Sequence, residues 1–346
     1  MGKVLALVEP AKLEFRKYEE EPLKEDEVRV KTLYSGISAG TELTSYRGFN
    51  PHLNKSWNSE LRIFEEKDDK ESSYPITNWG YEEVGKIIEI GAEVNRVEVG
   101  ETVYGTWGHR TSAVLSEDFA AEHRLPETAD PIYGIFSHIG SIALNAILDA
   151  DIHVGETAAV FGQGVPGQIV SQLAKLNGAE VIALDLNPER LETARKMGAD
   201  IVLNPAESDA AKEIKKLTGG RGADVSIEIS GSLKALHQAI KATTYSGKTI
   251  ASGFFAGSSE GLNLGEEFHH NRIQLICSQI SGVRPELSYR WDRLRLNQTI
   301  MELQQSEKIN LKGLITHMED FEEAEKLFKL LDQKPQAALQ TVLKFN

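Results

Sequence analysis

The chain has 346 residues, and at roughly 100–200 residues per domain this length predicts two domains. It carries 52 acidic against 38 basic side chains, a formal net charge of −14, and such a surface repels nucleic-acid phosphates and anionic lipid. We therefore expect no nucleic-acid partner and no binding to a membrane surface. No apolar run approaches the roughly 18 residues of a membrane span, so no membrane-spanning segment is expected either. The start of the chain turns acidic too early for a signal peptide, so a cytoplasmic location is expected. The single cysteine, Cys277, excludes an internal disulfide and any zinc site that needs several thiolates.

The first 136 residues alternate short β-branched runs with glycine, proline and charged turns. Runs at 27–33, 82–90 and 101–104 have the length and composition of short strands, and they predict a β-rich, barrel-like domain. Between Tyr46 and Asn78 the chain is polar and dense in charge, above all at 65–71. We expect this stretch to be an exposed loop of the barrel.

From residue 137 the pattern changes to strands that alternate with helices. The pattern predicts strands at 157–161, 180–184, 200–203, 223–229 and 248–253, and helices at 166–176, 188–197 and 234–243. Strands separated by helices of this length indicate an α/β fold, a doubly wound parallel sheet of the Rossmann type.

The last part of this pattern is less regular. Residues Ile273 to Val283 are expected to form the last strand of the sheet, with Cys277 as a small buried hydrophobe. Helices are expected at 291–305 and 321–331. The final run, 340–345, has the composition of a strand that can return to the first domain.

A glycine pattern, Gly162-Gln-Gly164-Val-Pro-Gly167, follows the strand at 157–161 and opens a helix. This context favours a dinucleotide site, because Gly162 permits a tight turn, Gly164 lets the backbone approach a pyrophosphate and Gly167 allows close packing of helix on strand. Pro166 in the first helical turn loses only an N–H that would have been free. The helix N-terminus then faces the pyrophosphate. A sheet-to-helix turn without a ligand is the alternative interpretation.

An acidic residue, Asp185, ends the next strand about 20 residues further on. Its carboxylate can accept hydrogen bonds from the adenosine ribose and would repel a 2′-phosphate, which favours NAD(H) over NADP(H). The alternative is that Asp185 caps the helix that starts at Asn187-Pro188. The predicted cofactor-binding residues are Gly162, Gly164, Val165, Pro166, Gly167, Asp185 and Arg190.

Over nearly its whole length the chain resembles the medium-chain, zinc-type alcohol dehydrogenases. The resemblance in the second half rests on 155–164, 185–199 and 222–231, in order and at the right intervals. In the first half, Tyr34-Ser-Gly-Ile-Ser-Ala-Gly-Thr-Glu is similar to the segment that carries the family's first zinc ligand, and Gly80-Tyr-Glu to the Gly-His-Glu segment that carries the second. The family arrangement implies a GroES-like catalytic domain at 1–136 and 286–346, and a Rossmann domain at 137–285.

The family's metal ligands are absent from the matching positions. Ser38 stands for the ligand cysteine, Tyr81 for the ligand histidine, and the third-ligand region offers only His138. Hydroxyl and phenol groups are poor zinc ligands near neutral pH, and the four-cysteine structural zinc lobe is missing. We therefore expect no metal, although a catalytic zinc held by some of Glu42, Glu82, His109 and His138 is the alternative. The same residues, with 268–272 and 289–293, resemble a zinc-less branch that includes bacteriochlorophyllide dehydrogenase-like proteins.

Without zinc, a protein group must take or give the proton of the alcohol. The resemblance makes Tyr81 the leading candidate, with Thr41 as a proton relay and Ser38 beside it. Glu82 and Glu42 can orient these hydroxyls or act as base, and His109 is another candidate lining the cleft. Structural roles stay open: Tyr81 can fill the lost metal site, Glu82 can hold the barrel, and His109 can be a surface or capping residue. His269 and His270 are expected in a polar loop beside the cofactor.

These observations predict an NAD(H)-dependent oxidoreductase that interconverts an alcohol and a carbonyl without zinc. A zinc-less enone or quinone reductase and a non-catalytic NAD(H)-binding protein are the alternatives. The family pairs edge to edge through the strand that matches Ile273–Val283, so a homodimer is expected and a tetramer is not excluded.

Overall fold

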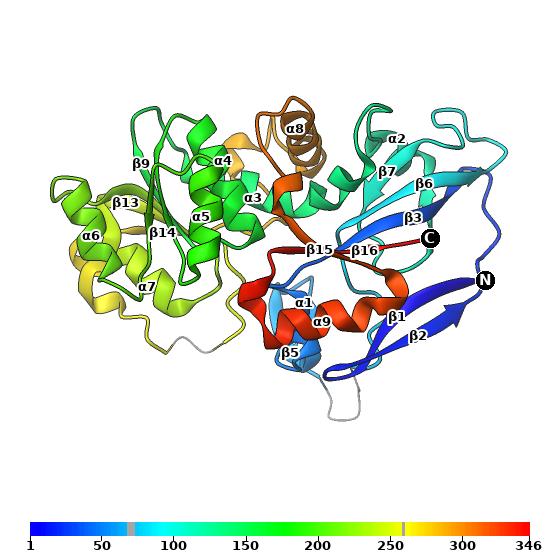
Figure 1. Ribbon diagram of the computed structural model, residues 1–346, viewed down its shortest axis with the longest axis horizontal. Coiled ribbons are helices and arrows are strands. Elements are labelled where there is room, and N and C mark those ends of the chain that lie inside the picture. The colour runs from blue at the N-terminus through cyan, green and yellow to red at the C-terminus, as the bar shows by residue number, and fades with distance from the viewer. Residues whose placement is uncertain (68–72, 258–259) are drawn as a thin grey trace. The chain divides into compact units, whose positions relative to one another are not determined.

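The computed structural model describes residues 1–67, 73–257 and 260–346, and they divide into two compact units (Figure 1). The β-rich unit comprises Met1–Ile135 and Ile315–Asn346, and the α/β unit comprises Phe136–Leu314. The second boundary therefore differs from the one expected at residue 285. The reason is packing: helix α8 (Arg293–Gln305) lies against α3 (Ser137–Ala150), where Ile300 meets Gly140 so closely that a Cβ there would be 2.5 Å from it.

The β-rich unit is built on a six-stranded sheet in the order β15-β16-β3-β6-β7, with β8 also paired to β3. Its last strand, β16 (Gln340–Lys344), runs antiparallel to β3 (Glu27–Ile37), so the predicted return of the C-terminal strand to the first domain is confirmed. The other strands and helices of the unit are β1 (Gly2–Glu9), β2 (Lys12–Tyr18), α1 (Glu42–Tyr46), β6 (Glu83–Ile90), β7 (Thr102–Gly105), β8 (Ser112–Ser116), α2 (Glu117–Glu122), β15 (Ile315–Asp320) and α9 (Ala324–Gln333).

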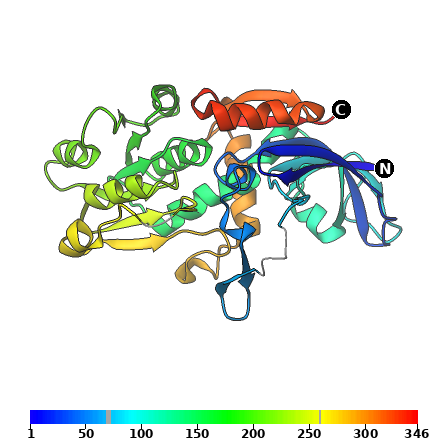
Figure 2. The same cartoon turned by 90° about the horizontal axis from the view of Figure 1, so that it is seen from below.

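The described residues between Tyr46 and Asn78 include regular structure where an exposed loop was expected. After a short 3-10 turn (Pro51–Leu53), β4 (Lys55–Asn58) and β5 (Ile63–Glu66) pair as an antiparallel hairpin. Trp57 and Phe64 face each other across the strands with ring centroids 5.1 Å apart, and such cross-strand aromatic pairs stabilise hairpins. Figure 2 shows this hairpin, in blue, extending from its unit. Part of the charged run, residues 68–72, lies outside the described residues.

The α/β unit contains a parallel sheet in the order β11-β10-β9-β12-β13-β14. The chain starts in the middle, moves outward to β11 and then crosses back to β12, which is the doubly wound order 3-2-1-4-5-6, and ligands bind where such a sheet reverses direction. The predicted fold class is confirmed. The elements are β9 (Thr157–Phe161), α4 (Val165–Leu176), β10 (Glu180–Leu184), α5 (Pro188–Lys196), β11 (Ile201–Leu203), α6 (Ala210–Leu217), β12 (Ala223–Glu228), α7 (Leu233–Ala242), β13 (Thr243–Ala251) and β14 (Gln274–Cys277).

The last strand of this sheet is shorter than expected, since β14 ends at Cys277 rather than near Val283. Cys277 is exposed, so its expected burial was wrong. The physical reason is its place on an edge strand, three of whose four residues are exposed. The pairing of a second copy along this edge stays a prediction.

One helical segment, Pro131–Ala150, is long and apolar enough to cross a membrane by length and composition. This corrects the expectation that no segment would meet that test. About three quarters of its most apolar window, 72%, is buried inside the protein, as in the core helix of a globular fold.

Candidate active site

The glycine pattern forms the turn between β9 and α4 in the α/β unit. Gly162 has a φ of +97°, in the region that favours glycine. A Cβ on Gly167 would lie 1.8 Å from the carbonyl oxygen of Gly162, so only glycine permits this approach of helix to strand. Gly164 is the N-cap of α4 and makes no side-chain cap, while Val165 and Pro166 form the first turn. This geometry fits the pyrophosphate of a dinucleotide, because a helix N-terminus presents N–H groups to an anion.

Asp185 lies directly after β10 and is partly exposed. One carboxylate oxygen accepts the Gln163 N–H at 2.6 Å and the other accepts the Asn187 N–H at 2.8 Å. The acid thus ties the glycine turn to the end of the next strand. The helix cap is Asn187, whose side chain accepts the Glu189 N–H, so the alternative in which Asp185 caps α5 was wrong. Arg190 lies in the first turn of that helix.

A second acid in the α/β unit, Glu228, was not among the predicted residues. It ends β12 beside Phe161 of β9, and one carboxylate oxygen accepts the Ser230 N–H at 2.8 Å while the other accepts the Gly231 N–H at 3.2 Å. Burial raises the pKa of this carboxyl to about 7, against the effect of these hydrogen bonds. Ser230 packs on the glycine turn, since a Cβ on Gly162 would lie 2.7 Å from it. The available sequence signal was an acid at the end of a strand that is buried along most of its length.

Three hydroxyl groups meet in the β-rich unit, from the loop after β3 and the residues just before β6. Tyr81 Oη hydrogen-bonds Ser38 Oγ and donates to Thr41 Oγ1 at 3.2 Å. Because the phenol proton goes to Thr41, the Ser38 hydroxyl is the donor to Tyr81, and the three form one chain. Ser38 is buried, while Tyr81 and Thr41 are partly exposed. The structure therefore brings together three of the five residues predicted for catalysis.

The turn that carries two of these hydroxyls is closed by hydrogen bonds at both of its ends. The Glu42 N–H donates to the Ser38 carbonyl at 2.9 Å, and the Ser38 N–H donates to Glu42 Oε1 at 2.8 Å. The Thr41 carbonyl accepts the Thr44 hydroxyl at 2.6 Å, and Asn50 in turn donates to that hydroxyl at 2.7 Å. The positions of the Ser38 and Thr41 side chains are thus set by the backbone of the turn.

Glu82 follows Tyr81 but points into the protein. Its side chain is 1% exposed and accepts a hydrogen bond from Gln340 Nε2 of β16 at 3.0 Å. It also lies against Gly36, where a Cβ would be 2.2 Å from its carboxylate. Burial, together with the Glu42 carboxylate, raises the pKa of Glu82 well above its usual range. Glu82 therefore joins the segment before β6 to β16, as in the structural alternative, and its raised pKa favours the protonated form.

His109 does not line a cleft, since its ring is fully buried. Its Nε2 lies 2.7 Å from Glu42 Oε2 and its Nδ1 lies 2.7 Å from Ser35 Oγ. The expectation that His109 lines the cleft was wrong, and so was the surface alternative, because neighbours including Trp79 and Phe328 pack around the ring. Ser35 was not among the predicted residues, although it lies in the run Tyr34–Glu42, which the resemblance singled out.

Zinc does not fit the residues at the matching positions. The hydroxyl groups of Ser38 and Tyr81 are bonded to each other, and burial raises the pKa of the Tyr81 phenol, so neither offers an anionic ligand. His138 lies on α3 in the α/β unit, where Arg293 donates a hydrogen bond to its Nδ1 at 2.8 Å. Burial and then the Arg293 charge lower the pKa of His138 to about 4. We derive no step through a metal.

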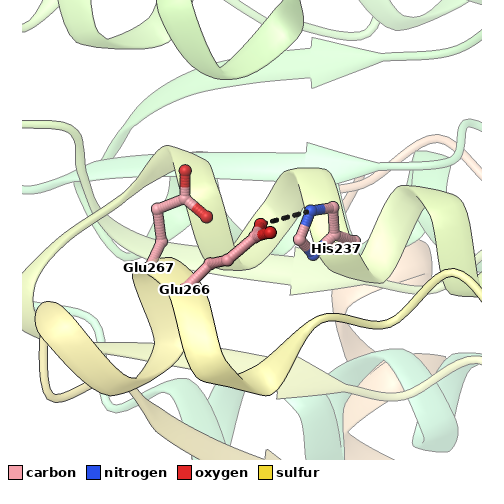
Figure 3. Close-up of side chains that lie close together, drawn as sticks. All are labelled: His237, Glu266 and Glu267. Atoms are coloured by element: carbon pink, nitrogen blue, oxygen red, sulfur yellow. Dashed lines mark ion pairs between the residues drawn. The ribbon is translucent and has the colours of Figure 1, made fainter.

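Within the described ranges, one group of histidine and acidic residues has ligand atoms within 4.8 Å of one another, namely His237, Glu266 and Glu267 of the α/β unit (Figure 3). Glu266 Oε2 is 3.8 Å from His237 Nε2, and Glu267 attracts the Lys215 ammonium. Glu266 is exposed and the other two are partly buried, and we interpret the group as an ion-pair cluster that joins α7 to the helical segment Leu264–Phe268. The neighbouring His269 and His270 are exposed and do not belong to it.

Comparisons with known proteins agree with this architecture. The family model described as zinc-binding dehydrogenase matches residues 166–294. The D-guloside 3-dehydrogenase of Escherichia coli (strain K12) is 31% identical over 351 residues, covering 99% of this chain and 97% of that protein. The (R,R)-butanediol dehydrogenase of Bacillus subtilis (strain 168) is 29% identical over 297 residues, covering 76% and 79% of the two chains.

Solved structures show the same fold. The 2R,3R-butanediol dehydrogenase from Bacillus subtilis superposes with a TM-score of 0.80 at 22% identity over 100% of both chains. A dehydrogenase from Sinorhizobium meliloti 1021 bound to NADP has a TM-score of 0.79 at 19% identity, covering 99% of each chain. An alcohol dehydrogenase from E. coli CFT073 complexed with NADH has a TM-score of 0.78 at 20% identity, also over 99% of each.

The nucleotide-binding fold, the glycine turn and the full-length similarity together define the class as a dehydrogenase. The chain belongs to the medium-chain, zinc-type dehydrogenase superfamily.

Proposed function

We propose that this protein interconverts a secondary alcohol and its carbonyl with NAD(H) as cofactor, and that Tyr81 rather than zinc handles the proton. The observation that carries the proposal is the hydroxyl chain from Ser38 through Tyr81 to Thr41. It occupies the two positions at which the resemblance to the zinc enzymes implies the first two metal ligands. On this ground we propose that the protein belongs to the zinc-less branch that resembles bacteriochlorophyllide dehydrogenase-like proteins.

The chemistry divides between the two units. A bound nicotinamide supplies or accepts the hydride at the carbinol carbon. The protein has to give a proton to the oxygen when the carbonyl is reduced, or remove that proton when the alcohol is oxidised. In the direction of oxidation, Tyr81 takes the alcohol proton as it passes its own to Thr41, which is partly exposed and can return it to water.

The protonation state of Tyr81 favours reduction at neutral pH. Burial and the neighbouring Glu82 raise the pKa of the phenol above its ordinary value, so the group stays protonated. A neutral phenol that receives a hydrogen bond from Ser38 is a good donor to a carbonyl oxygen and a weak base toward an alcohol. Oxidation is therefore expected to accelerate as the pH rises, and reduction is not.

The preference for NAD(H) is proposed from Asp185. A carboxylate beside the adenosine ribose repels the 2′-phosphate of NADP(H), and we expect a Kd for NADH at least about tenfold below that for NADPH, a difference of ~1.4 kcal/mol. The substitution Asp185→Asn removes the charge and keeps the side chain's size, so it is expected to lower the ratio of the NADPH Kd to the NADH Kd by about tenfold. Asp200→Asn is the matched control, since Asp200, like Asp185, accepts a backbone N–H, in its case from Val181 at 2.8 Å. Fluorescence titration with both cofactors measures the ratio, and tighter binding of NADPH by the wild type would contradict the argument.

The substrate is proposed to be a sugar or polyol bearing a secondary hydroxyl. Full-length similarity to a D-guloside 3-dehydrogenase and the lower similarity to a butanediol dehydrogenase support this class. The test is a panel of glycosides, polyols and diols with NAD⁺, and of the matching ketones with NADH, followed at 340 nm. Turnover of an enone or quinone without turnover of any alcohol would instead indicate a reductase. Tight NADH binding without hydride transfer to any member would indicate a binding protein.

A further inference from the structure

A second chain of polar residues lies in the interior of the β-rich unit, next to the three hydroxyls. It runs from Glu42 through His109 and Ser35 to Glu83, and each member is 4% exposed or less. The joining distances are 2.7 Å from Glu42 Oε2 to His109 Nε2, 2.7 Å from His109 Nδ1 to Ser35 Oγ, and 2.9 Å from Ser35 Oγ to Glu83 Oε1. Buried polar groups held this closely fix one another's orientation.

The number of protons that each group can donate sets the direction of the hydrogen bonds in this chain. Glu83 accepts from Ser35 Oγ at one oxygen and from the Trp107 N–H, at 2.7 Å, at the other. A serine hydroxyl has a single proton, and when it is given to Glu83, Ser35 must accept from His109 Nδ1–H. The remaining nitrogen, Nε2, then faces Glu42. Burial lowers the pKa of His109, but the Glu42 carboxylate outweighs this and raises it above its ordinary value. The raised pKa favours the protonated ring, with Nε2 facing Glu42 and Nδ1 facing Ser35.

Glu42 and His109 contact the two backbone segments that carry the hydroxyl chain. The second oxygen of Glu42 accepts the Ser38 N–H at 2.8 Å, which fixes the turn that carries Ser38 and Thr41. The His109 ring lies against Gly80, where a Cβ would be 2.8 Å from Cε1 and where φ is +90°. Gly80 is the residue before Tyr81, so the ring limits where the tyrosine backbone can lie.

We propose that Glu42 and His109 are positioning residues that hold the Ser38–Thr41 turn and the Gly80–Tyr81 segment at the spacing the hydroxyl chain requires. The proposal rests on the proposed function of Tyr81 as the group that handles the proton. The pair acts through the backbone, by a carboxylate on the Ser38 N–H and a ring on Gly80. Its loss should therefore slow the chemical step and leave cofactor binding, in the other unit, unchanged.

The test compares Glu42→Ala with Glu42→Gln. Glutamine can keep both contacts, accepting the Ser38 N–H through its oxygen and donating through its amide to a neutral His109. We expect Glu42→Ala to lower kcat about 10- to 100-fold with KM changed less than about threefold, and Glu42→Gln to recover most of the loss. His109→Phe keeps an aromatic ring against Gly80 but loses both hydrogen bonds, and it should lower kcat as Glu42→Ala does. Equal kcat in Glu42→Ala and wild type, or a glutamine variant as slow as the alanine variant, would overturn the proposal.

A second measurement does not depend on turnover. Ring-labelled tyrosine gives an NMR signal for Tyr81 that is assigned by its absence in Tyr81→Phe. The signal is expected to shift or broaden in Glu42→Ala and His109→Phe and to stay near its wild-type position in Glu42→Gln. An unchanged signal in all three folded variants would refute the positioning role. If the wild type turns over no substrate but the signal moves as expected, the proposed function fails while the positioning role stands.

Should His109→Phe fail to fold, the two Glu42 variants still decide the question, because thermal melting separates loss of structure from loss of position. A variant with an unchanged melting temperature and a lower kcat supports the proposal. A fall in kcat that merely follows a lower melting temperature, and is recovered on cooling, counts against it.

Discussion

The two units of this protein build their sites in opposite ways. In the α/β unit the site is made of backbone: three glycines, a helix N-terminus, and acids that accept backbone N–H groups from neighbouring turns. In the β-rich unit it is made of side chains, with three hydroxyls in contact beside four buried ionisable groups. A site made of backbone tolerates few substitutions without loss of binding. A site made of side chains can acquire a different chemistry by substitution while the fold is retained. The proposed replacement of the family's metal ligands by Ser38 and Tyr81 would be such an exchange.

The largest expected effect is the loss of the phenol from the side-chain site. Tyr81→Phe removes the proton donor and keeps the ring, so kcat is expected to fall about 10²- to 10⁴-fold, the usual contribution of a general acid. The Kd for NADH should not change, because the cofactor turn lies in the other unit. Steady-state kinetics and fluorescence titration measure both quantities.

The matched control for that variant is Tyr74→Phe. Tyr74 also donates its phenol proton within the β-rich unit, to the Ser45 carbonyl at 2.9 Å, but it stands outside the hydroxyl chain. Comparable kcat values for the two variants would show that Tyr81 only fills space.

The backbone site is tested by two glycines that differ in the room around them. A Cβ on Gly164 would have its nearest neighbour 3.9 Å away, whereas one on Gly167 would collide with the Gly162 carbonyl at 1.8 Å. We expect Gly164→Ala to fold with an unchanged melting temperature and to raise the Kd for NADH about tenfold or more, because the added methyl blocks the approach of the pyrophosphate. Gly167→Ala is expected to lower the melting temperature as well. Wild-type NADH affinity in Gly164→Ala would contradict the assignment of the turn.

The smallest expected effect concerns the buried acid Glu82. Because its pKa is raised in the folded state, the stability it contributes is present below its unfolded pKa, near 4.3, and is lost as pH rises toward the folded value. Glu82→Gln removes this loss, so the free energy of unfolding should fall less steeply with pH, by up to about 1.4 kcal/mol per pH unit. The pKa of His109 is also raised, so this residue lowers the free energy of unfolding with rising pH in the wild type and in Glu82→Gln alike.

Urea denaturation between pH 5 and 9 measures these slopes. Glu93→Gln, which alters an exposed glutamate of the same unit, serves as the control. Parallel pH profiles for wild type and Glu82→Gln would mean that Glu82 is ionised in the folded protein.

The backbone site could be predicted from the sequence because its requirements are local. The spacing of Gly162, Gly164 and Gly167 between a strand and a helix, and of Asp185 after the next strand, already specifies the turn. The doubly wound order followed from the alternation of strands and helices. Glu228 was not predicted as a site residue, because its partners are the N–H groups of the turn that follows it, and no spacing rule identifies such a contact.

The side-chain site could be predicted only in part. The resemblance pointed to Ser38, Thr41 and Tyr81, but the burial of His109 and its contacts to Glu42 and Ser35 depend on pairings between residues 67 and 74 positions apart. The hairpin at 55–66 was missed because charged residues mask the pairing of Trp57 with Phe64. The boundary at 314 was missed because the amphipathic pattern of α8 is compatible with packing in either unit. Its packing on α3 shows which unit it belongs to.

The central claim is that proton transfer rests on side chains and needs no zinc. Its most direct test is the metal content and turnover of one preparation, purified without added metal and then treated with a strong chelator. The account predicts far less than one zinc per chain by elemental analysis and the same kcat before and after chelation. Stoichiometric zinc whose removal abolishes turnover, with recovery when zinc is restored, would contradict it.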